Sequence, residues 1–501
     1  MTHVKAGPLA VLVCLMLLVA ATASAFDFSE LENSVGEYTL KNGLKVLIME
    51  RHDAPVVSCL TYANVGGSDD PKEYSGMAHM FEHMAFKGTK SVGSKDIDKE
   101  LELIAIEDSV FLELRTERKK GRFADSTRIA ALEAAYDSAR EASYELIEPN
   151  EFGNIIEREG GVGLNAFTSY DETVYFFSLP SNKVELWMAL ESERFLNPVL
   201  REMYKERDVV AEERRMRTES NPIGKLIEDF ISTSFKAHPY GRPIVGHMSD
   251  IQNYSRDAAI EYFEKYYGPS NLTIAIVGDV KTKDVLKLAK KYWERIPYRP
   301  APELLATVEP EQKGERRVAI EDPAQPFYIV GWHIPEATHP DRPALDALTD
   351  YLGQGRTSLL YKNLVKEKKA ALNIGAFGGF PGDKYPGLVA VYAMAAAEHD
   401  NPELEAEIFA EVEKLKTELI PAEEIEKIKA RAKAQFINGM DDNNGIAMQL
   451  AAYQTRWGNW RELFRELDRI NAVTAEDIQR VAIEYLTKKN RTVGMIIHQE
   501  S

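Results

Sequence analysis

The chain repeats one unit, a helix followed by a turn and a strand, once near its middle and once at its end. In the first copy, residues 260–263 lead into the strand pattern of residues 271–278. In the second copy, residues 483–486 lead into residues 490–497. Such self-similarity predicts an internal duplication, and hence an α+β fold of two homologous domains in which helices cover a sheet. The predicted first strands of the two halves are residues 44–48 and 317–320.

A proline-rich segment without periodicity, beginning at Pro297, separates the two halves. The N-terminus has Lys5, an apolar run too short for a mature span, and the small residues Ala23-Ser24-Ala25. These features predict a signal peptide cleaved after Ala25 and a periplasmic or secreted protein; an uncleaved anchor is the alternative. The expected divisions are a signal peptide at 1–25, an N-terminal domain at 26–299, a linker at 300–314 and a C-terminal domain at 315–501.

Charge and hydropathy argue against two classes of protein, nucleic-acid-binding proteins and membrane-spanning proteins. The net charge of −18 argues against nucleic-acid binding, because phosphate contacts need clusters of basic residues. After the first apolar run no stretch approaches 18 apolar residues, so we expect no membrane span after signal cleavage.

The segment His79-Met80-Phe81-Glu82-His83 carries the chemistry. On a helix, histidines four apart project from one face, and Glu82 is close enough to reach a water held between them. Two imidazoles and a carboxylate in the order H-x-x-E-H are typical of inverted zincins, which are zinc hydrolases. The competing interpretation is two ordinary histidines on a surface helix, but the helix is too apolar for that.

A third ligand is expected within residues 202–215. On a helix Glu206 and Glu213 share one side with Val209 and Val210, and two carboxylates in an apolar stripe need partners. We therefore predict Glu213 as the third zinc ligand and Glu206 as a carboxylate that orients a histidine or the zinc water. An acidic helix paired with neighbouring arginines is the alternative.

The sequence resembles the pitrilysin family, which includes insulysin and the β-subunit of mitochondrial processing peptidase. The likeness begins near residue 36 and is clearest in residues 76–89, with residues 165–169, 206–213 and 238–243 following in order. The resemblance implies zinc on His79, His83 and Glu213, with Glu82 activating water and Glu206 at the family's second acidic position. It also implies two domains of one fold facing each other across a chamber.

Further expectations follow from the same resemblance. Asn165, Ala166 and Phe167 match an edge strand on which the family aligns an extended peptide by strand addition. The second half lacks the zinc motif, so one zinc per chain is expected. The substrate would be a peptide or an unfolded polypeptide.

Two features depart from the family pattern. The 129 residues between His83 and Glu213 exceed the family's usual spacing, and the excess, at about residues 99–155, predicts an inserted helical hairpin. This hairpin either binds a partner, walls the chamber, or has no role. Complete family members also carry an Arg and a Tyr in the second half that contact the substrate carbonyl; Val365 and Leu372 occupy those positions here.

The sequence therefore predicts a zinc metalloendopeptidase subunit whose homologous partner supplies the Arg/Tyr pair, as in bacterial two-chain enzymes of the family. Alternatively, Arg356 or Tyr361 substitutes within the chain. A second class of function is a catalytically idle subunit that keeps the fold and binds peptides or assembles with others.

Overall fold

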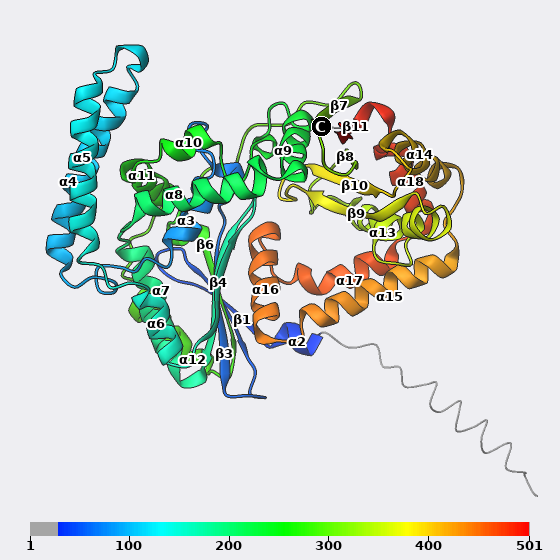
Figure 1. Ribbon diagram of the computed structural model, residues 1–501. Helices are drawn as coiled ribbons and strands as arrows, with labels where there is room; N and C mark the ends of the chain where they lie inside the picture. The colour runs from blue at the N-terminus through cyan, green and yellow to red at the C-terminus, as the bar shows by residue number, and fades with distance from the viewer. Residues whose placement is uncertain (1–28, 500–501) are drawn as a thin grey trace, which may run out of the picture.

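The computed structural model describes residues 29–499, so the expected signal peptide lies outside the described residues. Figure 1 shows two sheets, each flanked by helices, and the α+β class is confirmed. The first sheet has the strand order β1-β2-β6-β3-β5-β4. Its strands are β1 Val35–Thr39, β2 Lys45–Glu50, β3 Val56–Ala63, β4 Val162–Thr168, β5 Thr173–Pro180 and β6 Leu272–Gly278.

The second sheet, in the order β7-β11-β8-β10-β9, repeats the first without its outermost strand. Each sheet has one parallel pair of strands: β2 with β6 in the first sheet and β7 with β11 in the second. In both sheets the next neighbour in the order, β3 or β8, is antiparallel. This correspondence confirms the duplication. The prediction that residues 44–48 form the first strand is wrong, because β1 precedes them and pairs with β2. The strands are β7 Arg316–Asp322, β8 Phe327–Ile334, β9 Ala371–Phe380, β10 Gly387–Ala395 and β11 Arg491–His498.

Helices cover both faces of each sheet. In the first half they are α2 Ser29–Asn33, α3 Met77–Met84, α4 Ile97–Arg118, α5 Ser126–Tyr144, α6 Glu151–Arg158, α7 Val184–Leu196, α8 Met203–Arg214, α9 Pro222–Ser234, α10 Met248–Gln252, α11 Arg256–Tyr266 and α12 Thr282–Trp293. In the second half they are α13 Arg342–Gly353, α14 Asn401–Thr417, α15 Ala422–Gly439, α16 Asn443–Trp457, α17 Glu462–Ala472 and α18 Ala475–Tyr485.

Short turns of other helix types complete the chain. Two are π-helical, η4 Arg215–Glu219 and η7 Tyr361–Glu367. The 3₁₀ turns are η1 Gly67–Asp69, η2 Gly121–Phe123, η3 Ser181–Lys183, η5 Pro239–Gly241, η6 Pro269–Asn271 and η8 Lys488–Asn490.

The two halves exchange helices. Helix α16 of the second half lies on the first sheet, where Ile446 and Leu450 join a core with Leu47 and Leu60. Helix α9 of the first half lies on the second sheet, against β7 and β11, with Phe230 fully buried. Each sheet thus has one face covered by helices of its own half and the other by a helix of the opposite half.

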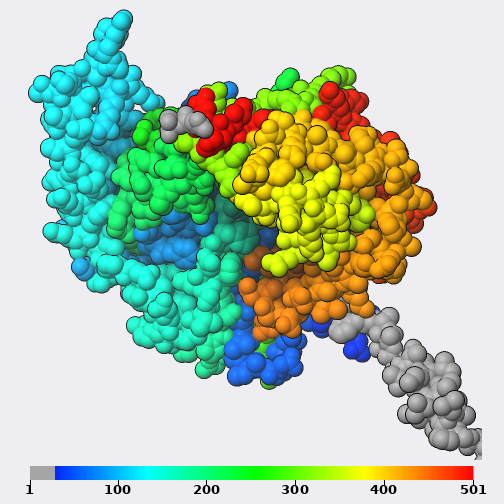
Figure 2. Space-filling model, turned by 45° about the vertical axis from the view of Figure 1, so that its right-hand side comes forward, coloured from blue at the N-terminus to red at the C-terminus, as the bar shows by residue number. Residues whose placement is uncertain are grey.

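Helices α4 and α5 pack side by side in a hairpin that stands out from the body (Figures 1 and 2). Its base is fixed by an ion pair in which the Arg201 Nε lies 2.8 Å from the Glu100 carboxylate, with both side chains buried. No helix within residues 29–499 is both long and apolar enough to cross a membrane.

Candidate metal centre

A buried carboxylate fixes the start of α3, the helix that carries the histidines. Gly76 adopts a left-handed conformation (φ 87°) and has no side chain to cap the helix. Asp70 replaces that cap, because its carboxylate accepts hydrogen bonds from the Gly76 and Ala78 N–H groups at 2.7 and 2.9 Å. Burial raises the pKa of Asp70 to about 7. A Cβ at Gly76 would lie 2.3 Å from the Val245 carbonyl oxygen, so the close approach of these segments requires glycine.

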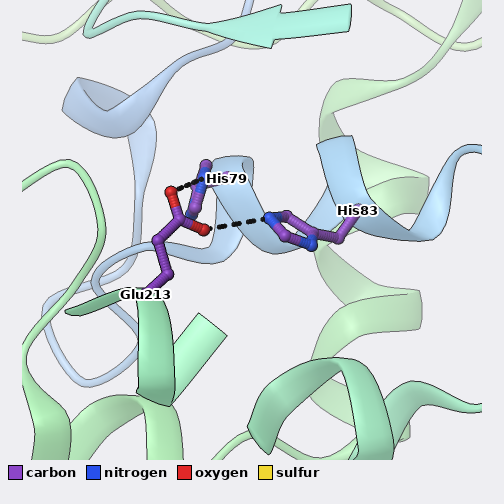
Figure 3. Close-up of side chains that lie close together, drawn as sticks. All are labelled: His79, His83 and Glu213. Carbon is purple, nitrogen blue, oxygen red and sulfur yellow. Dashed lines mark ion pairs between the residues drawn. The ribbon is translucent and has the colours of Figure 1, made fainter. Parts of the chain in front are cut away.

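The side chains of His79, His83 and Glu213 converge from two helices, α3 and α8 (Figure 3). The two Glu213 oxygens lie 3.5 Å from His79 Nε2 and 3.3 Å from His83 Nε2. Ligand atoms at tetrahedral angles on zinc, with bonds of about 2.0–2.1 Å, are about 3.3–3.4 Å apart. One ligand atom from each of the three residues lies within 4.8 Å of the other two, so a small closing movement of the side chains would bring them to this spacing. Two imidazoles and one carboxylate are a donor set that suits a zinc ion with one open position, so the residues fit the metal.

The surroundings set the protonation of the two histidines differently. Burial lowers the pKa of His79 to about 4, which keeps its imidazole neutral and able to bind a metal. For His83, burial lowers the pKa, but hydrogen bonds to Glu206 and Glu213 outweigh it and raise the pKa to about 9. A divalent cation at His83 Nε2 therefore competes with a proton, and metal binding there releases that proton.

Glu206 lies behind His83. One of its oxygens is 3.4 Å from His83 Nδ1, and the other is 2.6 Å from Lys87 Nζ. Burial opposes ionisation, yet these two contacts lower the pKa of Glu206. The expected role of Glu206, a carboxylate that orients a ligating histidine, matches this position. Lys87 was not predicted as a site residue. Its sequence signal was the i, i+4 spacing from His83, just beyond the end of α3.

A second residue outside the predicted set contacts the ligands. The Arg217 guanidinium lies 2.8 Å from the Glu213 carboxylate, and its side chain is 65% exposed. Arg217 belongs to η4, the π-helical turn that joins α8 to α9. The i, i+4 spacing from Glu213 was its only sequence signal. The predicted apolar stripe on α8 is partly wrong, since Val210 is buried but Val209 is 44% exposed.

Glu82 and the strand β4 lie side by side. Helix α3 packs against β4, and burial raises the pKa of Glu82, while the Thr168 hydroxyl at the end of β4 lowers it. Strand β4 is at the edge of the first sheet and pairs only with β5 within the described chain. Asn165 and Phe167 are exposed and Ala166 is buried. The edge of β4 that faces away from β5 has no strand partner within the described chain, and the Ala166 N–H donates to the Asn165 side-chain oxygen at 2.9 Å.

Residues 315–499 of the second half place no hydrogen-bond donor on His79, His83 or Glu213. Val365 packs against the second core and Leu372 is 55% exposed at the start of β9. Within residues 29–499, Arg356 and Tyr361 form no hydrogen bond or ion pair with His79, His83 or Glu213. The alternative in which either of them substitutes for the Arg/Tyr pair gains no support from this geometry.

Replacing Glu206 with glutamine is expected to weaken zinc binding about 10–100-fold, because an amide orients the His83 imidazole less firmly than a carboxylate. Glu202→Gln is the matched control, since Glu202 also contacts Lys87, at 3.1 Å, but no histidine. The dissociation constant is measured by competition with a chromophoric chelator. Equal zinc affinities in the two variants would show that Glu206 does not support the metal site.

The fold and the donor set together define a zinc-protease-like class of protein. Residues 45–116 and 145–247 match the family model described as Insulinase (Peptidase family M16), and residues 253–432 match the Peptidase M16 inactive domain. The chain belongs to the M16 family of peptidases. The matches leave out residues 117–144, which include most of the hairpin beyond α4.

Relatives extend the likeness to the whole chain. The zinc protease PqqE of Helicobacter pylori is 29% identical over 491 residues, 95% of each chain. A solved protease structure from Helicobacter pylori superposes with a TM-score of 0.77 at 28% identity, covering 92% of this chain and 99% of that one. The periplasmic protease PqqL of Escherichia coli shares the fold at 18% identity and a TM-score of 0.68; the match covers 93% of this chain but 48% of that one.

Proposed function

We propose that the chain is the zinc-bearing subunit of a metalloendopeptidase. The observation that carries the proposal is the convergence of His79, His83 and Glu213 at ligand spacing beside Glu82 and the free edge of β4. The names of M16 relatives as zinc proteases support zinc as the metal, with one ion per chain because the donor set occurs once within the described residues.

Different residues of the chain have different roles in the proposed hydrolysis. Zinc, when bound by His79, His83 and Glu213, would supply a Lewis acid that activates water. Glu82 takes the proton from the attacking water and returns it to the leaving amine, which is the work of a general base and then of a general acid. Glu206 holds the His83 imidazole through Nδ1, which fixes the tautomer that presents Nε2 to the metal.

The substrate is proposed to be a peptide or an unfolded polypeptide bound as an added strand on β4. The edge of β4 that faces away from β5 can form main-chain hydrogen bonds whatever the side chains of the peptide, once the Ala166 N–H exchanges its contact with the Asn165 side-chain oxygen for one with the peptide. The exposed Phe167 offers an apolar contact. An extended strand on this edge passes beside Glu82, because α3 packs on β4.

A homologous partner is proposed to complete the site and enclose the substrate in a chamber. Val365 and Leu372 have no group that donates a hydrogen bond to a developing oxyanion. The 48% coverage of PqqL supports pairing, because that periplasmic protease is about twice the matched length. The idle peptide-binding subunit is the second candidate, favoured by the same two apolar residues. Secretion or a periplasmic location remains part of the proposal, since residues 1–25 lie outside the described chain.

The chain alone, loaded with zinc, is expected to hydrolyse a quenched fluorescent peptide slowly. Adding a homologous subunit that carries the Arg/Tyr pair is expected to raise kcat by about 10²–10³-fold, the usual contribution of one oxyanion-stabilising donor. A partner whose Arg and Tyr are replaced by Val and Leu is the control. Full activity of the chain alone would remove the need for a partner, and no activity with either partner would favour the idle subunit.

A further inference from the structure

The end of the hairpin combines positive charge with an exposed aromatic ring. We define the hairpin tip as residues 118–123, which read Arg118-Lys119-Lys120-Gly121-Arg122-Phe123. Four of these six residues are cationic and none is acidic, in a chain whose net charge is −18. All six are exposed, and the Phe123 side chain is 75% exposed. Such a concentration of positive charge on an acidic protein indicates that the tip binds a negatively charged partner surface.

Two of the four cations have no carboxylate partner within the described chain. Arg118 pairs with Glu133 and Lys120 with Glu117, each at 2.6 Å, but Lys119 and Arg122 form no ion pair. The Arg122 guanidinium lies 4.7 Å from the centre of the Phe123 ring, so charge and apolar surface are presented together. The pair of Arg118 with Glu133 is exposed on both sides and therefore weak, which leaves Arg118 able to bind an anion together with Lys119 and Arg122. The Glu117 partner of Lys120 is buried, so Lys120 is the most firmly held of the four cations.

The hairpin holds the tip away from the rest of the molecule, as Figures 1 and 2 show. About midway along α4 the Arg256 guanidinium lies 3.1 Å from the buried Glu107 and also contacts Asp108. Phe111 of α4 and Tyr136 of α5 pack on Tyr204 of α8. These contacts hold the hairpin in a fixed direction relative to the body, so the tip is presented on a rigid support.

We propose that the hairpin tip docks on the surface of a membrane containing anionic phospholipid. Specific protein interfaces bury about 800 Å² on each partner and use about 20–30 residues, far more than this tip offers. A lipid surface needs no matching shape, and each Lys or Arg near it raises partitioning about fivefold. Phe123 would enter the boundary between headgroups and acyl chains, where aromatic side chains are favourable. This inference is independent of the proposed peptidase activity.

The test is co-sedimentation of the full chain with vesicles of equal parts phosphatidylglycerol and phosphatidylcholine, compared with phosphatidylcholine alone. Binding to the anionic vesicles that falls as salt is added is expected. The triple variant K119E/K120E/R122E should lose at least about tenfold in partition coefficient. The matched control, K291E/K313E/K489E, makes the same change in net charge at three exposed lysines elsewhere and should bind within about twofold of the unaltered chain.

A second variant tests insertion of the ring. Phe123→Trp should show a blue shift of the new indole emission on anionic vesicles, and Phe123→Ala should bind less tightly at unchanged charge. All variants share one N-terminus, so its apolar residues contribute equally to each. The proposal is overturned if the full chain does not bind anionic vesicles at low salt, if both triple variants lose binding equally, or if the tip binds an acidic protein but no vesicle.

Discussion

Replacing Glu82 with glutamine is expected to lower kcat for peptide hydrolysis by about two to four orders of magnitude, the usual contribution of a general base. The amide has nearly the same shape as the carboxylate but accepts no proton from water at neutral pH. Glu82 is not among the converging ligand residues, so zinc affinity should stay within a few-fold of the unaltered chain. Turnover of a quenched fluorescent peptide and zinc content of the same preparation are the two measurements.

The matched control for this substitution is Glu212→Gln. Glu212 directly precedes the proposed ligand Glu213, but its side chain is 59% exposed and, within residues 29–499, forms an ion pair only with Arg215, so activity should be retained. Undiminished turnover in Glu82→Gln would contradict the assignment of the base. Loss of zinc together with activity would instead place Glu82 among the ligands.

Replacing Phe230 with alanine is expected to lower the free energy of unfolding by about 3–5 kcal/mol, the cost of emptying a well-packed aromatic site. Phe230 of α9 is fully buried against the second sheet. The strands beneath it have glycines at the contact: a Cβ at Gly331 or Gly494 would lie 2.9 or 3.1 Å from the ring. The surrounding side chains of Leu226, Ile329 and Leu388 are already packed in the same core, so they can fill the cavity only in part. Urea denaturation followed by circular dichroism measures the effect.

Asp229→Ala is the control on the same helix, because Asp229 is exposed and should change stability by no more than about 0.5 kcal/mol. The transition of the Phe230→Ala variant should remain single, since the exchanged helices join both sheets in one unit. Two separated transitions, or a loss equal to that of the control, would show that α9 does not link the halves.

The local sequence pattern was sufficient to predict most residues of the candidate site. Histidines four apart on an apolar helix predicted that His79 and His83 share one face, and the helical period brought Glu206 and Glu213 to the same side of α8. The structure brings all four together with Glu82. Each of these residue pairs shares one face of a single helix, and the periodic sequence pattern shows which residues share a face. Only the packing of α3 against α8 is needed to bring the two faces together.

Long-range contacts were not predictable in the same way. Asp70 caps α3 from a preceding loop, and β1 pairs with β2 although it is short and half exposed. The exchange of α9 and α16 was likewise unforeseen, because an amphipathic helix shows that it has an apolar face but not which sheet covers it. The duplication itself was visible, since two copies of one unit leave two copies of one pattern.

The position of α16 in the chain determines when the first sheet can be covered during synthesis. The apolar face of the first sheet, which includes Leu47, Leu60 and Val277, is covered by residues that reach Phe464. A ribosome has therefore made every residue from Leu47 to Phe464 before that face is fully buried. Until then the nascent N-terminal half exposes an apolar sheet surface, the kind of surface that chaperones hold and that aggregates if left alone. The cover of the first sheet is thus completed by α16 and α17, which are made long after the strands that they cover.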